Sequence, residues 1–349
     1  MESLGRDFTS RYNQRYNTVS KRILRMLSED SRASLTSMSK ELNVSRRSIA
    51  TRIKRLEGEL DINYVPELNE DALGFSNQHL IAVKFEDKPD FDEIGKLLSA
   101  SRVPQMVAQV RGTFDMLIYA NAPSRQEYVR WDKGTQVALA DYNVMWHPSE
   151  IAHRQLGFFP IRNKLIEAAN LKPKYKNLLL HLNRNARASF QEISKETDMH
   201  FNTVSYEFWK LMKMNYVKRF TIAMSIPKDV AVMVHFGKYV LPKTFEQDMQ
   251  KTRREYKADE DNPLISRYIL CSQLIGSYDF AAMGVFDDYN TAYKRQVKYY
   301  KEVLKPERAR VEYGQIERIL FGRLPIRTVN TAKEYDTVVW DEKAASGEA

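Results

Sequence analysis

Apolar residues recur at helical spacing near the start of the chain. Ile49, Ile53 and Leu56 fall at i, i+4 and i+7, which places them on one inward face of a helix. Two shorter segments before this helix show similar amphipathic spacing, and a two-residue connection leads into it. Two short helices, a tight turn and a third helix predict a helix-turn-helix. The three helices are expected over residues 18–28, 35–42 and 45–60.

The segment that follows alternates between strand-like and helix-like patterns. Its order, βαββαβ, predicts a ferredoxin-like unit, in which an antiparallel sheet carries helices on one face. The six elements are expected over residues 80–85, 91–100, 103–111, 114–120, 124–133 and 142–151.

The chain also resembles itself at two places in the same order. KRILRMLSEDSRASLTSMSKEL (21–42) aligns without gaps with KNLLLHLNRNARASFQEISKET (176–197). VRGTFDMLIYA (110–120) resembles LIGSYDFAAMG (274–284), with a Gly-x-aromatic-Asp motif in each. Two collinear matches predict duplication of a unit of about 150 residues.

The predicted fold class is therefore α+β, with two winged helix-turn-helix domains alternating with two ferredoxin-like domains. The second ferredoxin-like unit should repeat the βαββαβ order over 230–240, 245–256, 264–274, 278–286, 289–304 and 311–321. The predicted divisions are a polar, basic arm (1–17), the first helix-turn-helix (18–75), the first α/β domain (76–155), a linker (156–173), the second helix-turn-helix (174–226), the second α/β domain (227–327) and a polar tail (328–349).

The third helix of the first copy, SRRSIATRIKR (45–55), carries five positive charges and no acid. When its apolar stripe faces inward, its arginines face outward, where guanidinium groups can read guanine O6 and N7 in the major groove. Thr51 can contact a thymine methyl, and Ser45 with the helix N-terminus can bind a phosphate. The alternative is a solvated basic helix face. The residues of this copy predicted to contact DNA are Ser34, Ser45, Arg46, Arg47, Ser48, Thr51, Arg52, Lys54 and Arg55.

The equivalent helix of the second copy, HFNTVSYEFWK (200–210), is not basic, because Glu207 offsets Lys210. Its apolar spacing still predicts the same fold. Tyr206 could read bases, or Tyr206 and Trp209 could pack against a partner domain, and the sequence leaves both open. The candidate DNA contacts of this copy are His200, Asn202, Thr203, Tyr206 and Lys210.

Composition supports an anionic partner and excludes several other classes. The net charge of +9 over 349 residues favours a polyanion such as double-stranded DNA. A single cysteine, Cys271, excludes an intrachain disulfide, and the six histidines show no metal-ligand spacing. We expect no metal and no cofactor. The polar start of the chain lacks the apolar core of a signal peptide, and no apolar run is long enough to span a membrane, so a cytoplasmic protein is expected.

The segment RILRMLSEDSRASLTSMSKELNVSRRSIATRIKRLE (22–57) and the repeated Gly-x-aromatic-Asp motif resemble the leucine-responsive/asparagine-regulator (Lrp/AsnC) family. The resemblance implies that the helix-turn-helix binds DNA and that the α/β unit dimerises through its sheet. It also implies an amino acid or related small molecule bound at a subunit interface. The effector candidates are Gly112, Thr113, Phe114, Asp115, Gly276, Ser277, Tyr278 and Asp279. Alternatively, these glycines only permit tight turns, and the aspartates only cap them.

The sequence differs from the family pattern in holding two units in one chain. It therefore predicts an intramolecular pseudo-dimer, which could assemble into a further homo-oligomer. LEGELDINYVPELN (56–69) lacks a glycine-led turn, so the shape of the wing stays open. The unequal third helices predict either a non-palindromic operator or one reading head and one structural head.

Two other functions compete with a sequence-specific transcriptional regulator. A sirohaem decarboxylase would resemble this family and would also use paired units. The region around Arg111 holds no histidine, and His147 and His153 fall in or beyond the last strand of the first copy. An architectural DNA-binding protein is the other alternative. Because no phosphate-binding glycine loop, nucleophile elbow or metal cluster is present, the sequence predicts that the protein is not an enzyme.

Overall fold

The computed structural model describes residues 18–223, 230–240, 268–286, 288–290, 292–294 and 309–326. The predicted arm (1–17) and tail (328–349) lie outside these residues, as do most of the two helices predicted over 245–256 and 289–304.

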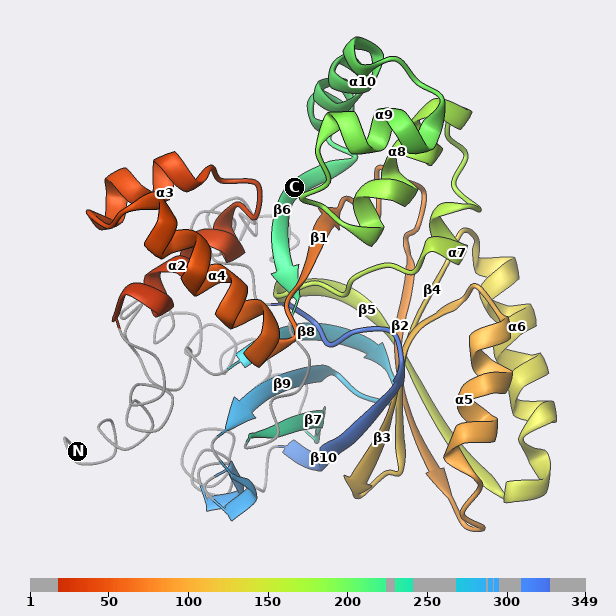
Figure 1. The fold of residues 1–349 in the computed structure, drawn as a ribbon. Coiled ribbons are helices and arrows are strands. Elements are labelled where there is room, and N and C mark those ends of the chain that lie inside the picture. The colour runs from red at the N-terminus through yellow and green to blue at the C-terminus, as the bar shows by residue number, and fades with distance from the viewer. Residues whose placement is uncertain are drawn as a thin grey trace, which may run out of the picture.

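The first helical unit consists of α2 (Thr18–Glu29), α3 (Leu35–Leu42) and α4 (Arg46–Leu60), as predicted (Figure 1). Asn43 ends α3 and Asp61 ends α4, both in the left-handed conformation that allows a tight turn out of a helix. The unit closes around fully buried apolar side chains from all three helices. These include Ile23, Leu27, Met38, Ile49 and Leu56.

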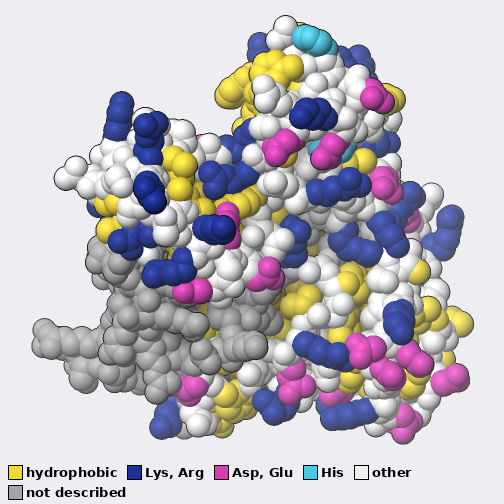
Figure 2. Space-filling model, in the orientation of Figure 1, with side chains coloured by type: hydrophobic (Ala, Val, Ile, Leu, Met, Phe, Trp, Pro, Cys, Tyr) yellow, Lys and Arg dark blue, Asp and Glu magenta, His cyan; other side chains and the backbone are white. Residues whose placement is uncertain are grey.

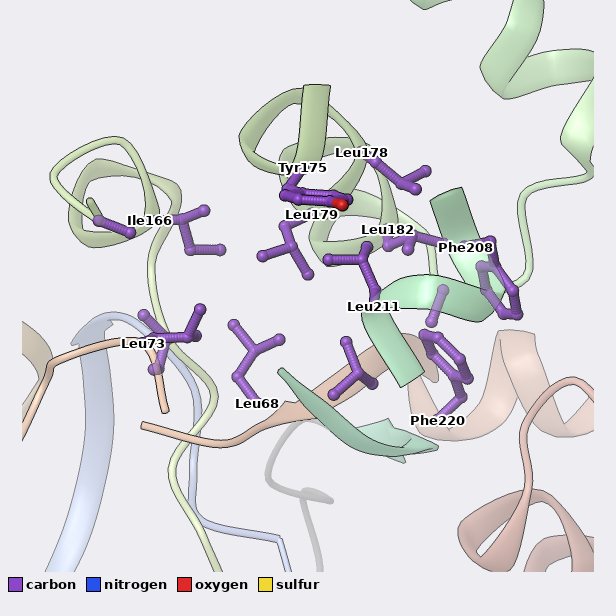
Figure 3. Packing of buried hydrophobic residues seen from close by; sticks show 14 of the residues in the cluster. Leu68, Leu73, Ile166, Tyr175, Leu178, Leu179, Leu182, Phe208, Leu211 and Phe220 are labelled. Carbon is purple, nitrogen blue, oxygen red and sulfur yellow. The ribbon is translucent and has the colours of Figure 1, made fainter. Parts of the chain in front are cut away.

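The second helical unit consists of α8 (Pro173–Arg184), α9 (Phe190–Thr197) and α10 (Phe201–Lys213). Pro173 occupies the first turn of α8, where a missing N–H costs nothing, and a capping box at Ser189 and Glu192 starts α9. Leu179, Leu182 and Phe208 pack between the helices and the strand below them (Figure 3). No helix in the described part of the chain is long and apolar enough to cross a membrane.

The strands of both α/β units form one closed barrel with the order β10-β3-β4-β2-β5-β8-β9-β7. Each half has the order expected of a ferredoxin-like sheet. The halves join edge to edge where β5 pairs with β8 and where β3 pairs with β10. This pairing satisfies the backbone groups that an open sheet would leave exposed at its edges. The first half contains β2 (Asn77–Phe85), β3 (Pro104–Gly112), β4 (Met116–Ala122) and β5 (Val144–Leu156), and the second contains β7 (Ala231–Tyr239), β8 (Tyr268–Gly276), β9 (Phe280–Phe286) and β10 (Ala309–Phe321).

The barrel interior is a packed apolar core built from both halves. Phe114 and Phe236 meet edge to face with ring centres 5.5 Å apart, and Tyr119 stacks on Phe159 at 3.9 Å. Helices α5 (Phe91–Ala100) and α6 (Arg125–Ala138) cover the outer face of the first half, and a short 3-10 helix, η1 (Ala140–Tyr142), leads into β5 (Figure 1).

The predicted wings take a different form. The sequence predicted a separate winged domain in each copy. Among the described strands, each helical unit is instead followed by a single strand. These strands, β1 (Asn63–Leu68) and β6 (Val217–Ala223), pair with each other antiparallel. The two helical units therefore share one two-stranded sheet.

The segment predicted as a linker, 156–173, packs against the rest of the molecule. Phe158 bridges to Ile326, and the short helix α7 (Asn163–Ile166) buries Leu165 completely. Behind it, Arg154 of β5 donates to Glu70 at 2.8 Å, which ties the chain after β1 to the barrel. The connection between the two copies is therefore part of the folded core.

Candidate nucleic-acid interface

Helix α4 presents a basic face to solvent because its apolar stripe is used in packing. Ser45 caps the helix by accepting from the backbone N–H of Ser48 at 3.2 Å. Leu56 and the rest of the apolar stripe are buried, so the opposite face is left outside. Arg46, Arg47, Thr51, Lys54 and Arg55 are exposed, and Arg52 is half-buried.

The polar contacts on this face leave most of its positive charge uncompensated. Arg55 forms an ion pair with Glu59 at 3.6 Å, and the Arg52 Nε lies 3.4 Å from the Ser48 hydroxyl. Within the described residues, Arg46, Arg47 and Lys54 form no ion pair. Lys and Arg side chains stand out over the unit that contains α2–α4 (Figure 2). Such a face suits a polyanion, which would gain counterion release on binding.

Two of the residues predicted to contact DNA, one serine and one threonine, make hydrogen bonds within the helical unit. The Ser34 hydroxyl caps α3 by accepting from Ser37 N at 3.0 Å. Thr51 turns its hydroxyl back to the Arg47 carbonyl at 3.0 Å, which leaves its methyl as the outward group. The structure thus brings the nine residues predicted in the first copy to the start of α3 and along α4.

In the second unit, the polar candidates lie at the N-terminal end of α10. The His200 ring caps the helix by accepting from Asn202 N at 3.3 Å. Asn202, Thr203 and Tyr206 are exposed. This end of α10 therefore offers neutral groups where α4 offers arginines.

The sequence offset the charge of Glu207 against that of Lys210, and the structure shows that the ion-pair partner of Glu207 is a different lysine. The Glu207 carboxylate is 3% exposed and forms an ion pair with Lys174 of α8. Lys210 instead lies 5.7 Å from the ring centre of Tyr206. The carboxylate of Glu207 is therefore buried against α8, while Lys210 stays at the surface of α10.

Large apolar side chains cover the rest of the α10 surface. Tyr206 and Trp209 are each 64% exposed, and Phe201 is 42% exposed. The packing of Tyr206 and Trp209 against another domain, which the sequence left open, does not occur within the described part of this chain.

A pair of equivalent arginines holds the two helical units together, and sequence reasoning missed this role. Arg32 reaches from the first unit to the Ala188 carbonyl at 3.0 Å and lies 4.9 Å from the Phe208 ring centre. Arg187, at the matching position of the repeat, reaches back to the Tyr64 hydroxyl at 3.2 Å. The repeated Arg-Ala-Ser run was the available signal.

The predicted effector residues lie in the turns between β3 and β4 and between β8 and β9. Asp115 accepts from Lys84 at 3.1 Å and from the Phe85 backbone at 3.0 Å. Asp279 makes the same two contacts, with Lys238 at 2.8 Å and with Tyr239 N at 2.7 Å. Both carboxylates are therefore engaged in holding a neighbouring strand.

The other members of these turns lie at the seams between the halves or in the core. A Cβ on Gly112 would lie 2.3 Å from the Tyr313 carbonyl, and Gly276 has a φ of +137° against Pro148. Thr113 donates to the same Tyr313 carbonyl at 3.0 Å. The remaining three are Phe114, buried in the barrel, Ser277, whose N–H donates to Pro148, and Tyr278, whose hydroxyl donates to Glu312 at 2.6 Å.

Comparison with known proteins supports the assignment of the first helical unit as a helix-turn-helix. The family model of the AsnC-type helix-turn-helix domain matches residues 19–57. An uncharacterized HTH-type transcriptional regulator of Pyrococcus furiosus is 32% identical over 116 residues, which are 33% of this chain and 78% of that protein. A similar regulator of Pyrococcus horikoshii is 29% identical over 119 residues, which are 34% of this chain and 80% of that protein.

Among solved structures, the fold matches that of the siroheme decarboxylase NirDL with a TM-score of 0.56 and 12% identity. The match covers 91% of this chain and 97% of that one. This finding overturns the prediction that the protein is not an enzyme, because a catalyst has the same fold along nearly the whole chain. The absence of a phosphate-binding glycine loop, a nucleophile elbow and a metal cluster from the sequence argues only against the enzymes that need those motifs.

The regulator matches and the basic helix-turn-helix agree with the resemblance seen in the sequence. The chain belongs to the Lrp/AsnC family of helix-turn-helix transcriptional regulators.

Proposed function

We propose that the protein is a sequence-specific DNA-binding regulator that reads the major groove with α4. The observation that carries this proposal is the exposed face of α4, where Arg46, Arg47 and Lys54 have no carboxylate partner among the described residues. An α-helix fits the major groove, and arginine there forms bidentate contacts with guanine. The N-terminus of α4 at Ser45 suits a backbone phosphate that fixes the register.

We also propose that the two helical units arose by duplication and act as an intramolecular pseudo-dimer. The reciprocal reach of Arg32 and Arg187 supports this, as does the shared β1–β6 sheet. Because one chain holds both units, association entropy is replaced by a high effective concentration. The heads differ in chemistry, with arginines on α4 and aromatic and neutral polar groups on α10, so the operator should be non-palindromic.

The test compares the affinity of the full chain for a selected duplex with its affinity for a scrambled duplex of the same length, over a range of salt. A specific regulator should prefer its site by about a thousandfold or more. Equal affinity for both duplexes would indicate an architectural protein, and no binding at low salt would exclude DNA as the partner.

A small-molecule effector and assembly into larger oligomers remain predictions. The contacts of Asp115 and Asp279 favour a structural role for the two turns. Calorimetric titration with a panel of amino acids, together with light scattering, would test both predictions.

A second candidate function is decarboxylation of a sirohaem-like tetrapyrrole. The match to siroheme decarboxylase NirDL over 91% of the chain favours it at the level of fold. Incubation with sirohaem should then change the visible spectrum and release carbon dioxide. A protein that does neither, while binding DNA specifically, would act as a regulator alone.

A further inference from the structure

A cleft lies where the connector between the copies meets the end of α8 and the chain after β10. Its volume is about 390 Å³. Four of its nine described lining residues are basic, namely Arg162, Lys164, Arg184 and Arg323, and none of the nine is acidic. Volumes of this size are typical of small-molecule sites.

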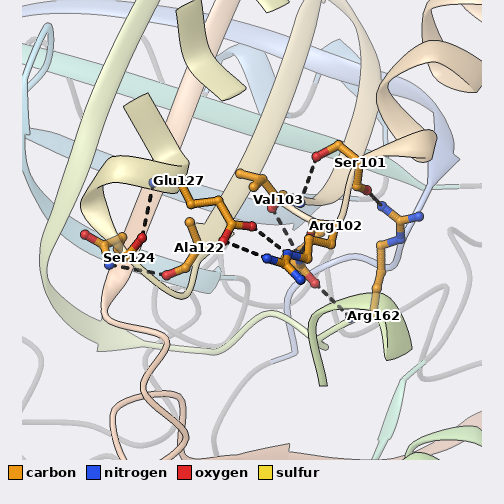
Figure 4. Close-up of polar contacts among 9 residues, drawn as sticks. Ser101, Arg102, Val103, Ala122, Ser124, Glu127 and Arg162 are labelled. Carbon is orange, nitrogen blue, oxygen red and sulfur yellow. Dashed lines mark hydrogen bonds and ion pairs between the residues drawn. The ribbon is translucent and has the colours of Figure 1, made fainter. Parts of the chain in front are cut away.

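Two of the four cations donate to backbone carbonyls, which are neutral acceptors, so these contacts do not neutralise their positive charge. The Arg162 guanidinium donates to the Ser101 carbonyl at 3.1 Å (Figure 4). It also donates to the Pro104 carbonyl at 2.7 Å. Lys164 donates to the Ser99 carbonyl at 2.8 Å. These carbonyls hold the side chains in place at the end of α5, but they carry only partial charges.

The other two cations have few competing contacts. Arg323 is half-buried, and its side chain lies 3.5 Å from the Asn63 amide oxygen. Burial lowers the pKa of Arg323, and the nearby Asp61 carboxylate, which does not line the cleft, opposes this shift only in part. Arg184 is exposed at the end of α8 and forms no ion pair within the described residues.

We infer that this cleft binds a small anion that carries more than one phosphate or carboxylate oxygen. Arg184 and Arg323 would contact the anion, while Arg162 and Lys164 would supply a fixed positive field. Two guanidinium groups can each donate two parallel hydrogen bonds to such an oxygen pair. A zwitterionic amino acid fits poorly, because no described lining residue is a carboxylate that could accept from its ammonium group.

The cleft lies between the second helical unit and the barrel, so a bound anion would contact both. Asn183 belongs to α8 and donates to the Ile161 carbonyl of the connector at 2.8 Å, while Arg323 follows the last barrel strand. A bound anion would therefore stabilise the docking of the second helical unit on the barrel.

The experiment is calorimetric titration of the full chain with inorganic phosphate and separately with citrate, at constant ionic strength set by sodium chloride. We expect saturable binding of at least one anion and a rise in Tm. Arg184→Glu should weaken that binding about tenfold or more, the amount expected for losing a charge-assisted contact. Arg184→Lys should retain part of it. Arg130→Glu is the matched control, because Arg130 is exposed on α6 away from the cleft.

Three results would overturn the inference. The first is the absence of saturable binding of either anion up to about 10 mM, where even a millimolar site fills. The second is an equal loss in the Arg130→Glu control, which would indicate a general charge effect. The third is a loss of DNA affinity in Arg184→Glu without any binding of free anions, which would make the cleft part of the DNA surface. Specific DNA binding by α4 could persist in the first two cases, so the two proposals fail separately.

Discussion

Arg46 and Arg47 stand on the open face of α4, where each can reach a base edge or a phosphate. Arg47→Ala should cost roughly 1–3 kcal/mol of specific binding if the side chain reads a guanine. Fluorescence anisotropy on the selected and scrambled duplexes measures this. A loss that is the same on both duplexes would assign Arg47 to a phosphate, and an equal loss for Asn202→Ala would show that both heads read bases.

Arg32 is the residue whose removal should most disturb the contact between the helical units. Its guanidinium lies 4.9–5.6 Å from the ring centres of Phe190, Phe208 and Phe220 and donates to two carbonyls. Arg32→Ala should lower the free energy of unfolding by about 2–3 kcal/mol, because it leaves a cavity and unpaired carbonyls. Arg187→Ala loses one ring contact and one hydroxyl contact, so it should lower the free energy of unfolding by less. Urea titration of both variants measures the two free energies. Equal costs would contradict this ranking.

His79 gives the protein a sensitivity to acid. Its ring stacks on Tyr128 at 3.6 Å, and burial lowers its pKa to about 4, below the ordinary value near 6.5. The unfolded chain therefore binds more protons between these values, so stability is fully present above pH 6.5 and falls as the pH drops toward 4. The loss attributable to His79 should be on the order of 3 kcal/mol once the pH has fallen to about 4. Chemical denaturation of His79→Phe should show a shallower decline with acid, and an unchanged decline would rule His79 out as its source.

At the scale of elements, the close approach of the paired strands where the two halves of the barrel join limits the size of the side chains there. Gly112 of β3 lies so near β10 that a Cβ would meet the Tyr313 carbonyl at 2.3 Å. Gly112→Ala should therefore separate the strands locally and destabilise the fold by about 1–3 kcal/mol. Gly134→Ala is the matched control: it is exposed in α6 with no atom within 4 Å of the added Cβ, and it should stabilise by about 1 kcal/mol. Thermal unfolding measures both variants. An unchanged stability of Gly112→Ala would show that β3 and β10 can separate locally at little cost.

The shared β1–β6 sheet determines how the two helical units are related. Six paired positions run from Asn63 opposite Ala223 to Leu68 opposite Val217, and backbone contacts from Ser31 and Ala186 join each unit to the strand of the other. The helical units that contain α4 and α10 are thus joined through one shared sheet, which would set the spacing of the two helices if both contact DNA.

At the scale of the whole molecule, one chain carries two heads of unlike chemistry on a single barrel. A footprint on the selected operator should therefore be asymmetric, with strong protection on the α4 side and weaker protection on the α10 side. Arg46→Ala should remove the strong side first, because the charged residues of α4 are expected to contribute most of the phosphate attraction. Symmetric protection of a palindromic site would contradict the predicted inequality of the heads.

Elements that depend on local pattern were predictable. The apolar stripe of α4, its Ser45 cap and the break at Asn43 follow from residues within a few positions of one another. The three helices predicted for the first unit begin and end within a residue of the observed ones. The outward face of α4 followed directly from this, so the candidate residues of the first copy lie where they were expected.

Features that depend on contacts between distant segments were not predictable. The sequence alone determined the described helices and the alternation of the strands, and it predicted the duplication, because backbone and side-chain preferences act over short range. Only the tertiary structure decided that β5 pairs with β8 and β3 with β10, and that β1 pairs with β6 in place of separate wings. It also withdrew Glu207 into the core and gathered Arg184 and Arg323 at one cleft. Strand pairing and charge burial depend on which distant surfaces meet, and no local pattern carries that information.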